Sequence, residues 1–540
     1  MSRPRPPEPA PAAAPPSRHL TAPIVLLLLS LYLLLAPLRI DSGDGEAIYQ
    51  VTHSLVAGEG LAIPPPPAGA VVVDAFGEPI PPERLRGGGP YGAWGRDGRY
   101  YAQYGVGQSL LAAPLYGLGQ RLYRLTGWGT EGFVTRAAVS LLSPLVLALT
   151  GGVLYRLGRQ LGYGADAATG AALVIALATP LWVYSKTFFS EPLLTLLLAL
   201  AALTALQADG GRTGAWAVCG AALGFAVLVK PAALAVTPAF LIHAAWRRAG
   251  RWRALALLAG PLAAGVAGAA AANWTRFGSP LDTGYRTAAW DVPPWVGLAG
   301  LLISPGKGLL WYCPPLVAGL AGFPALWRRQ RRAAALSVGA ATLYLLAHVS
   351  YNHWHGGGAW GPRLILPVAP LLLLPLAGWF QRPPRRAVAR LALAALLAAG
   401  LIVQLPAVLV HPARALQSLY DRSASPTEYT LRLLYRPADS PLLGQWRSLL
   451  EVAALNRDPA SRAALVGMAQ QADGEADDDP LTAAVGRLAF NTFDLWPVYW
   501  RLLGAPPAPL LLVEGGLAAL AGWSALRLRR GAPWEGRDDP

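Results

Sequence analysis

Repeated long blocks of apolar residues, almost free of charge, constrain this chain more than any other feature. Examples are the blocks 24–35, 193–206 and 364–376. A hydrocarbon core about 30 Å thick is crossed by about 20 mostly apolar residues in a helix. Lipid offers the backbone no hydrogen-bond partner, so each block is expected to be helical. The sequence therefore predicts an all-α polytopic membrane protein.

Composition agrees with this fold class, because only 14% of the 540 residues are charged against about 25% in soluble proteins. We predict about twelve transmembrane helices. Their expected bounds are 21–38, 133–155, 165–183, 191–208, 214–230, 232–246, 254–273, 308–327, 333–350, 364–380, 388–410 and 508–526.

The net charge of +15 sits in short arginine clusters between apolar blocks. Clusters at 247–253, 328–332 and 382–390 follow every second predicted helix, which is the pattern that orients membrane proteins with these loops inside. This distribution argues against a nucleic-acid partner. Both termini are expected in the cytoplasm.

Two predicted outer segments exceed the length of ordinary connections. The expected organisation is a disordered cytoplasmic tail (1–20), a transmembrane core (21–410) that includes the outer loop 39–132, a small outer-face segment (411–507), a last transmembrane helix (508–526) and a cytoplasmic tail (527–540). Within the first outer loop, 44–57 and 105–125 are expected to be amphipathic surface helices.

Three carboxylates, Asp41, Asp44 and Glu46, follow the first predicted helix. A carboxylate there suits a general base that accepts a proton from an acceptor hydroxyl, or a ligand of a divalent cation. The alternative is that these carboxylates are only the solvated start of a loop, which the charge pattern alone also allows.

The chain has only three lysines, Lys186, Lys230 and Lys307, and all fall at predicted outer ends of helices. A compact ammonium at that depth suits a lipid phosphate, whereas snorkelling explains any one of them alone. Arg363, at the outer mouth of a helix, is a further candidate for phosphate binding.

Other outer-side residues are candidates for substrate contact. Glu191 tops an apolar helix and needs a partner. Trp354 and Trp360 suit either an aromatic belt or stacking on a sugar. The pair His353-x-His355 could bind metal, but no third ligand is evident.

These features resemble the glycosyltransferase C superfamily, and specifically bacterial relatives of protein O-mannosyltransferases and aminoarabinose transferases. The similar stretches are Asp41–Tyr49, Gly98–Gln108 with Ala113-Pro114, and Phe189–Pro192. The resemblance implies that a first-loop acid is catalytic and that the donor is a polyprenyl-phosphate sugar. It also marks Tyr104 as substrate-binding. Many members have adjacent Asp-Glu where a glycine here separates Asp44 from Glu46.

The resemblance leads us to expect a membrane glycosyltransferase of the bacterial inner membrane with its active site on the outer face. Asp44 is the first choice for the base, with Glu46 and Asp41 after it. The acceptor would be a protein, lipid or glycan. No cofactor is assigned, and a divalent cation stays open. The alternatives are a lipid or glycan flippase and an inactive relative that serves as an assembly partner.

Overall fold

The computed structural model describes residues 20–67, 69–85, 87–247, 249–470 and 479–530. The first half of the chain forms α1 (Thr21–Leu34), α2 (Gly43–Ala57), α3 (Gly107–Thr126), α4 (Glu131–Ser140), α5 (Leu142–Gln160), α6 (Ala165–Leu177), α7 (Leu181–Tyr184), α8 (Glu191–Asp209), α9 (Ala215–Val229), η2 (Pro231–Val236), α10 (Thr237–Ala245) and α11 (Arg251–Phe277).

The second half continues with α12 (Pro294–Ile303), α13 (Leu309–Tyr312), α14 (Pro315–Arg329), α15 (Arg331–Val349), η3 (Arg363–Val368), α16 (Ala369–Leu373), α17 (Leu376–Gln381), α18 (Ala387–Leu409), α19 (Ala413–Tyr420), α20 (Pro426–Tyr435), η4 (Pro437–Asp439), α21 (Pro441–Leu455), α22 (Pro459–Gln470), α23 (Pro480–Asn491), α24 (Trp496–Leu502) and α25 (Pro507–Arg530).

The predicted fold class is confirmed, since the chain is a helical, multi-pass membrane protein. Seven helices within the described residues are long and apolar enough to cross a membrane: Glu131–Gln160, Glu191–Asp209, Arg251–Phe277, Arg331–Val349, Arg363–Gln381, Ala387–Leu409 and Pro507–Arg529. Five shorter apolar helices accompany them, so the count of twelve spans is not confirmed.

Prolines account for several differences from the predicted spans, because proline lacks the amide hydrogen that a helix interior needs. The predicted span 165–183 is divided at Thr179-Pro180 into α6 and α7, and 308–327 is divided at Cys313-Pro314 into α13 and α14. The apolar helix α12 lies in a stretch that we had expected to be a loop.

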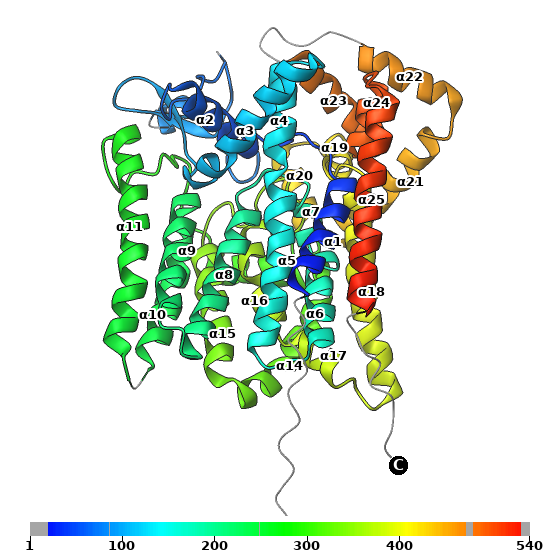
Figure 1. Ribbon diagram of the computed structural model, residues 1–540. Coiled ribbons are helices and arrows are strands. Elements are labelled where there is room, and N and C mark those ends of the chain that lie inside the picture. Colours follow the sequence, from blue (N-terminus) through cyan, green and yellow to red (C-terminus); the bar gives the residue numbers. More distant parts are fainter. Residues whose placement is uncertain (1–19, 68, 86, 248, 471–478, 531–540) are drawn as a thin grey trace, which may run out of the picture.

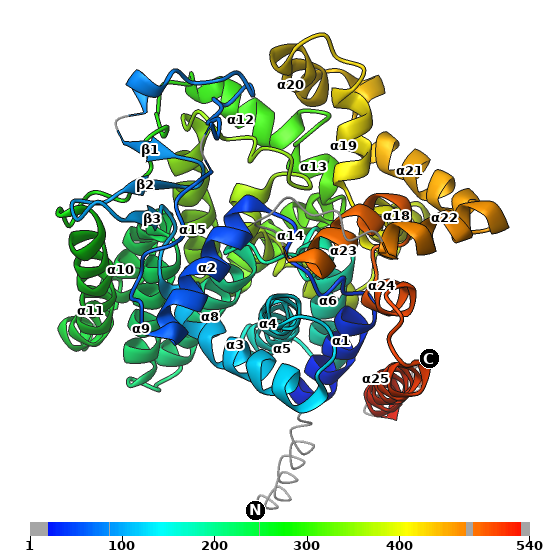
Figure 2. The same cartoon turned by 90° about the horizontal axis from the view of Figure 1, so that it is seen from above.

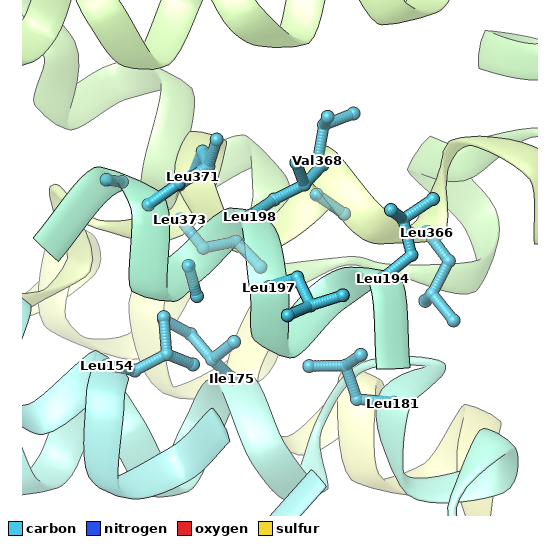
Figure 3. Packing of buried hydrophobic residues seen from close by; sticks show 14 of the residues in the cluster. Leu154, Ile175, Leu181, Leu194, Leu197, Leu198, Leu366, Val368, Leu371 and Leu373 are labelled. Carbon is cyan, nitrogen blue, oxygen red and sulfur yellow. The ribbon is translucent and has the colours of Figure 1, made fainter. Parts of the chain in front are cut away.

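Helix α8 lies at the centre of the bundle. Figure 3 shows Leu194, Leu197 and Leu198 of α8 between side chains of α5, α6 and α7 on one side and of η3 and α16 on the other. In its most apolar stretch 83% of the residues are buried, against 17% in α11 and 11% in α25. The poorly buried helices are therefore those that face lipid.

Glycines bring α9 and α11 into close contact. A Cβ added at Gly265 of α11 would lie 2.3 Å from the backbone of Gly224 of α9, and one at Gly220 would lie 2.1 Å from the Leu258 carbonyl oxygen. Small residues at such crossings allow membrane helices to approach backbone to backbone.

The two ends of the bundle differ (Figure 1). One end carries α2, α3 and α19–α24, together with the short antiparallel sheet of β1 (Gly88–Gly89), β2 (Gly92–Trp94) and β3 (Tyr100–Ala102). We call it the loop end. The connections α10–α11, α14–α15 and α17–α18 lie at the other end. The arginine clusters lie in these connections and in the helix ends that flank them, so we call it the arginine end.

Both surface helices expected in the first outer loop are present as α2 and α3. The segment 411–507 folds into α19–α24 and packs at the loop end, while α25 runs down beside α1 at the edge of the bundle (Figure 2). Residues 1–19 and 531–540 of the predicted tails lie outside the described residues.

Candidate active site

A cavity of about 1400 Å³ opens at the loop end. Its wall comes from stretches that are far apart in sequence, including the start of α2, the first-loop segment 71–77, the α7–α8 connection, η2, the loop 353–363 and the α19–α20 region. Eight of the predicted site residues line it: Asp41, Asp44, Tyr104, Lys186, Lys230, His353, Trp360 and Arg363.

A row of four alternating charges joins four segments of the chain. Asp44 Oδ2 lies 2.9 Å from Arg363 Nη1, Arg363 Nε lies 3.7 Å from Glu191 Oε1, and Lys230 Nζ lies 2.7 Å from the same Glu191 oxygen. Glu191 is almost fully buried behind the cavity wall and holds both cations in place. Four formal charges thus balance, and Asp44, Arg363 and Lys230 face the cavity.

The start of α2 explains how Asp44 reaches the cavity. Ser42 caps the helix by accepting a hydrogen bond from the Gly45 amide, and an acid in the first turn is favoured by the helix dipole. A Cβ at Gly45 would lie 2.9 Å from Ile40 Cγ2 and from Ser42 Oγ. A side chain in place of the glycine between Asp44 and Glu46 would therefore have to displace Ile40 or the capping hydroxyl of Ser42.

Glu46 turns away from the cavity, although it was the second choice for the base. Arg136 of α4 holds it with two hydrogen bonds, of 2.6 and 3.1 Å, and Gln50 donates a third of 2.8 Å. The Arg136 guanidinium also lies 4.4 Å from the centre of the Tyr49 ring. This environment gives Glu46 a role in holding α2 against α4.

Lys186 ends in a buried ion pair with Asp494, whose Oδ2 lies 3.1 Å from Nζ. It also donates to the backbone oxygens of Val408 and Asp494. Arg39 donates to Asp494 Oδ1 over 3.1 and 3.2 Å. Lys186 therefore ties the α7–α8 connection to the segment after α23, and little of its hydrogen-bonding capacity is left for a phosphate.

Lys307 is buried outside the cavity wall, where its ammonium donates to the carbonyl oxygens of Gly357 and Ala359. These carbonyls belong to the glycine-rich loop 356–361, in which Gly356 and Gly357 have φ of 70° and 63°. Burial and the charge of Arg363 lower the pKa of Lys307 to about 7.

The two predicted tryptophans differ in position. Trp360 lies in the cavity wall, with its ring nitrogen donating to Gln404 Oε1 over 3.0 Å. Trp354 lies off the cavity and packs on α12, where a Cβ at Gly300 would lie 2.1 Å from the indole ring. Trp354 therefore serves packing.

Tyr104 borders the cavity beside Asp44, and its ring contacts Tyr285. Its backbone carbonyl accepts a hydrogen bond of 2.8 Å from Arg276 of α11. Burial raises the pKa of the Tyr104 phenol well above its ordinary value, and the charge of Asp44 adds to the effect. The phenol is thus a protonated donor at neutral pH.

His353 also lines the cavity, where its Nδ1 lies 2.9 Å from Asn352 Oδ1. The ring centroids of His353 and His355 lie 6.4 Å apart. Across the described part of the chain, no group of three or more His, Cys, Asp or Glu side chains is placed to hold a metal ion.

Sequence reasoning missed His411 and Asp494. His411 Nε2 lies 3.2 Å from Asp41 Oδ2, and Asp494 pairs with Arg39 and Lys186. Both come from the segment 411–507, more than 350 residues from Asp41 in the chain, and neither lies in a motif. No local signal in the sequence could have placed them beside the first loop.

Comparison with known proteins finds one family whose model matches part of the chain. Residues 131–272 match the family described as dolichyl-phosphate-mannose-protein mannosyltransferase. The chain therefore resembles the protein O-mannosyltransferases, as the motifs led us to expect. The matched region holds Lys186, Glu191 and Lys230 but neither Asp44 nor Arg363. No curated protein matches the chain.

Three solved structures are also similar. ArnT from Cupriavidus metallidurans bound to undecaprenyl phosphate has 17% identity over 87% of this chain and 84% of that chain, with a TM-score of 0.45. The apo form of the same protein has 18% identity over the same shares of both chains, with a TM-score of 0.44. The Archaeoglobus fulgidus oligosaccharyltransferase gives 14% identity over 80% of this chain and 63% of that chain, with 0.41. At these scores the chemistry has to come from the chain's own residues.

Proposed function

We propose that the chain is a glycosyltransferase that moves a sugar from a polyprenyl-phosphate donor to a hydroxyl group of an acceptor. The observation that carries this proposal is the row Asp44–Arg363–Glu191–Lys230 at one wall of the cavity. It sets a carboxylate beside two cations, which is the combination that transfer from a phosphate leaving group requires. The match to the mannosyltransferase family supports the same reaction class.

In the proposed reaction the acceptor oxygen attacks the anomeric carbon, and the bond from that carbon to the phosphate oxygen breaks. Asp44 accepts the proton of the acceptor hydroxyl, and the electron pair of the broken bond stays on the polyprenyl phosphate. A single displacement of this kind inverts the anomeric centre. General-base assistance contributes about 10²–10⁴ in rate.

Arg363 and Lys230 are the proposed binding groups for the phosphate. A guanidinium has five N–H donors, of which Arg363 gives one to Asp44, and an ammonium has three, of which Lys230 gives one to Glu191. Donors that are positioned before the charge develops stabilise the leaving phosphate without reorganisation.

The proposed location is the outer face of the bacterial inner membrane. The support is the separation of the loop end from the arginine end (Figure 1), because arginine-rich short loops stay in the cytoplasm. The cavity would then receive an acceptor protein, lipid or glycan from outside, while the polyprenyl chain stays in the bilayer.

The test is transfer by the full-length protein in lipid nanodiscs, with a panel of radiolabelled polyprenyl-phosphate sugars and membrane extracts as acceptors. Asp44→Asn keeps the shape of the side chain but removes its charge, so we expect transfer to fall about 10²–10⁴-fold while donor binding persists. The product to measure is free polyprenyl phosphate, together with the labelled acceptor.

Asp458→Asn is the matched control. Asp458 is exposed in the segment 411–507, and its carboxylate accepts a hydrogen bond from the Ser461 hydroxyl. This variant should transfer at the wild-type rate. A flippase would move the labelled lipid across a bilayer without releasing polyprenyl phosphate. Full transfer by Asp44→Asn would remove Asp44 from the mechanism.

A further inference from the structure

One buried carboxylate oxygen beside the cavity lacks a hydrogen-bond partner among the described residues. Asp41 lies between α1 and α2 and lines the cavity. Its Oδ1 is buried and makes no hydrogen bond with any described residue. A buried acceptor left in this state costs about 1–3 kcal/mol, and more when it is charged. Such an atom calls for an explanation, and a bound ligand is one.

The other oxygen of Asp41 is held by His411. Nε2 of His411 lies 3.2 Å from Asp41 Oδ2, while Nδ1 lies 3.0 Å from the Ala413 amide nitrogen. Because the amide can only donate, Nδ1 must accept, and Nε2 therefore carries the hydrogen that points to Asp41. The imidazole is neutral in this arrangement and also stacks on Phe490.

A second layer of charges fixes the position of Asp41. Arg39 Nη2 lies 3.8 Å from Asp41 Oδ2 and 3.1 Å from Asp494 Oδ1, and Lys186 balances Asp494. Two cations and two carboxylates thus cancel. Burial would raise the pKa of Asp41, but the hydrogen bond from His411 and the charge of Arg39 outweigh it and keep the pKa below its ordinary value.

We propose that Asp41, oriented by His411, is a binding site for one hydroxyl group of the sugar that is transferred or of the acceptor glycan. Oδ1 accepts the hydrogen of that hydroxyl group. This inference rests on the proposed glycosyl transfer, and it assigns to Asp41 the selection of a sugar while Asp44 performs the proton transfer. His411 acts as a positioning residue.

The charge balance is what favours a hydroxyl. A phosphate would meet a negative oxygen, and an ammonium would need a net negative site, whereas Arg39, Lys186, Asp41 and Asp494 sum to zero. A neutral hydroxyl group has a small desolvation cost. It gains a hydrogen bond to an ionised acceptor, which is stronger than one to a neutral acceptor. A site built to receive a hydroxyl rejects an analogue that lacks it.

The test compares the accepted sugar with its mono-deoxy analogues in the transfer assay. We expect Asp41→Asn to lower kcat/KM for the parent sugar about 10- to 100-fold. One deoxy analogue should be used equally by Asp41→Asn and the wild type, because it lacks the hydroxyl that Asp41 binds. An equal loss for the parent and every analogue would overturn the proposal.

His411 gives a second readout that a merely structural role would not move. A glutamine at 411 can still place an N–H near Asp41, whereas a phenylalanine keeps the ring volume and loses the donor. His411→Gln should therefore keep the preference for the parent sugar over the critical deoxy analogue, and His411→Phe should lose most of it. Equal preferences in the two variants would remove His411 from the site. Asp458→Asn is again the matched control.

The inference and the proposed transfer can fail separately. If no donor in the panel is turned over, binding of methyl glycosides to the full-length protein is measured by saturation-transfer NMR. Binding by the wild type that Asp41→Asn weakens about 10-fold would support the hydroxyl site without transfer. Equal binding by both proteins, or none by the wild type, would overturn it.

Discussion

The three lysines show how much the role of one side chain depends on its partner. Lys230 pairs with Glu191 at the cavity wall, Lys186 pairs with Asp494 in another part of the same wall, and Lys307 donates to backbone carbonyls away from it. All three were predicted to bind donor phosphate because they share one side of the membrane. Lys230 and Arg363 both line the cavity and both lie beside Glu191, and for this reason we propose them as the phosphate-binding pair.

Lys230→Ala is therefore expected to weaken binding of the polyprenyl-phosphate sugar by about 1.5–3 kcal/mol, the worth of one charge-assisted hydrogen bond. Donor affinity in nanodiscs is the measurement. Arg328→Ala, which removes an exposed cation at the arginine end, is the matched control and should bind as the wild type does. Equal affinity in both variants would mean that Lys230 serves only Glu191.

Lys307 predicts a pH dependence of stability. Burial lowers the pKa of its ammonium to about 7 in the folded protein, against about 10.4 in the unfolded chain. Between these values the unfolded state binds a proton that the folded state lacks, so the free energy of unfolding rises with pH, by at most about 1.4 kcal/mol per unit. Below about pH 7 the full cost of burying the charge is present.

Lys307→Met should remove this rise. The difference in free energy of unfolding between wild type and variant, followed by chemical unfolding from pH 6 to about pH 10, is expected to shift steadily in favour of the wild type. Parallel curves for the two proteins would show that Lys307 keeps its proton in the folded state.

At the residue scale the sequence could suggest residues that lie near one another, but it could not show the partner of each side chain. Asp44 and Arg363 were chosen from motif and position, and they meet although 319 residues separate them. Glu46 was the second choice for the base, after Asp44. On a helix these two lie two positions apart and point in different directions, so Glu46 meets Arg136 instead.

At the scale of elements, the α9–α11 contact tests the packing. Gly265→Val would place a branched side chain where the Gly224 backbone lies, and overpacking of this kind costs about 1–3 kcal/mol. We expect a lower melting temperature of the purified protein. Gly260→Val is the matched control, because an added Cβ at Gly260 has no described atom within 4 Å. Equal melting temperatures would place α11 further from α9.

The elements that the sequence could predict are those set by local rules. Apolar blocks such as 191–208 and 388–410 gave α8 and α18 to within two residues, and α2 and α3 followed from their periodicity. The helix breaks at Pro180 and Pro314 were harder to predict from the sequence. Proline is tolerated inside α11 and α18, where neighbouring groups satisfy the backbone. Tertiary packing decides between these outcomes.

At the scale of the whole molecule, the cavity is made by chain segments that only folding brings together. The first loop supplies Asp41 and Asp44, the α7–α8 connection supplies Lys186, and the segment 411–507 supplies His411 and Asp494. Apolar periodicity carries no information about such long-range pairs. The sequence could therefore predict the class of the fold, but not the full set of residues that line the cavity.

The topology of the bundle decides from which side an acceptor arrives. Cys219 and Cys313 are both buried, so labelling of an introduced cysteine can be measured with little labelling of the native ones. Arg99→Cys at the loop end replaces a side chain that is 64% exposed, and Gln330→Cys lies in the exposed α14–α15 connection at the arginine end. Because arginine-rich loops stay inside, an impermeant maleimide should label Arg99→Cys in intact cells and Gln330→Cys only after lysis. The reverse pattern would place the cavity in the cytoplasm, and it would contradict transfer on the outer face while leaving the chemistry of Asp44 to its own test.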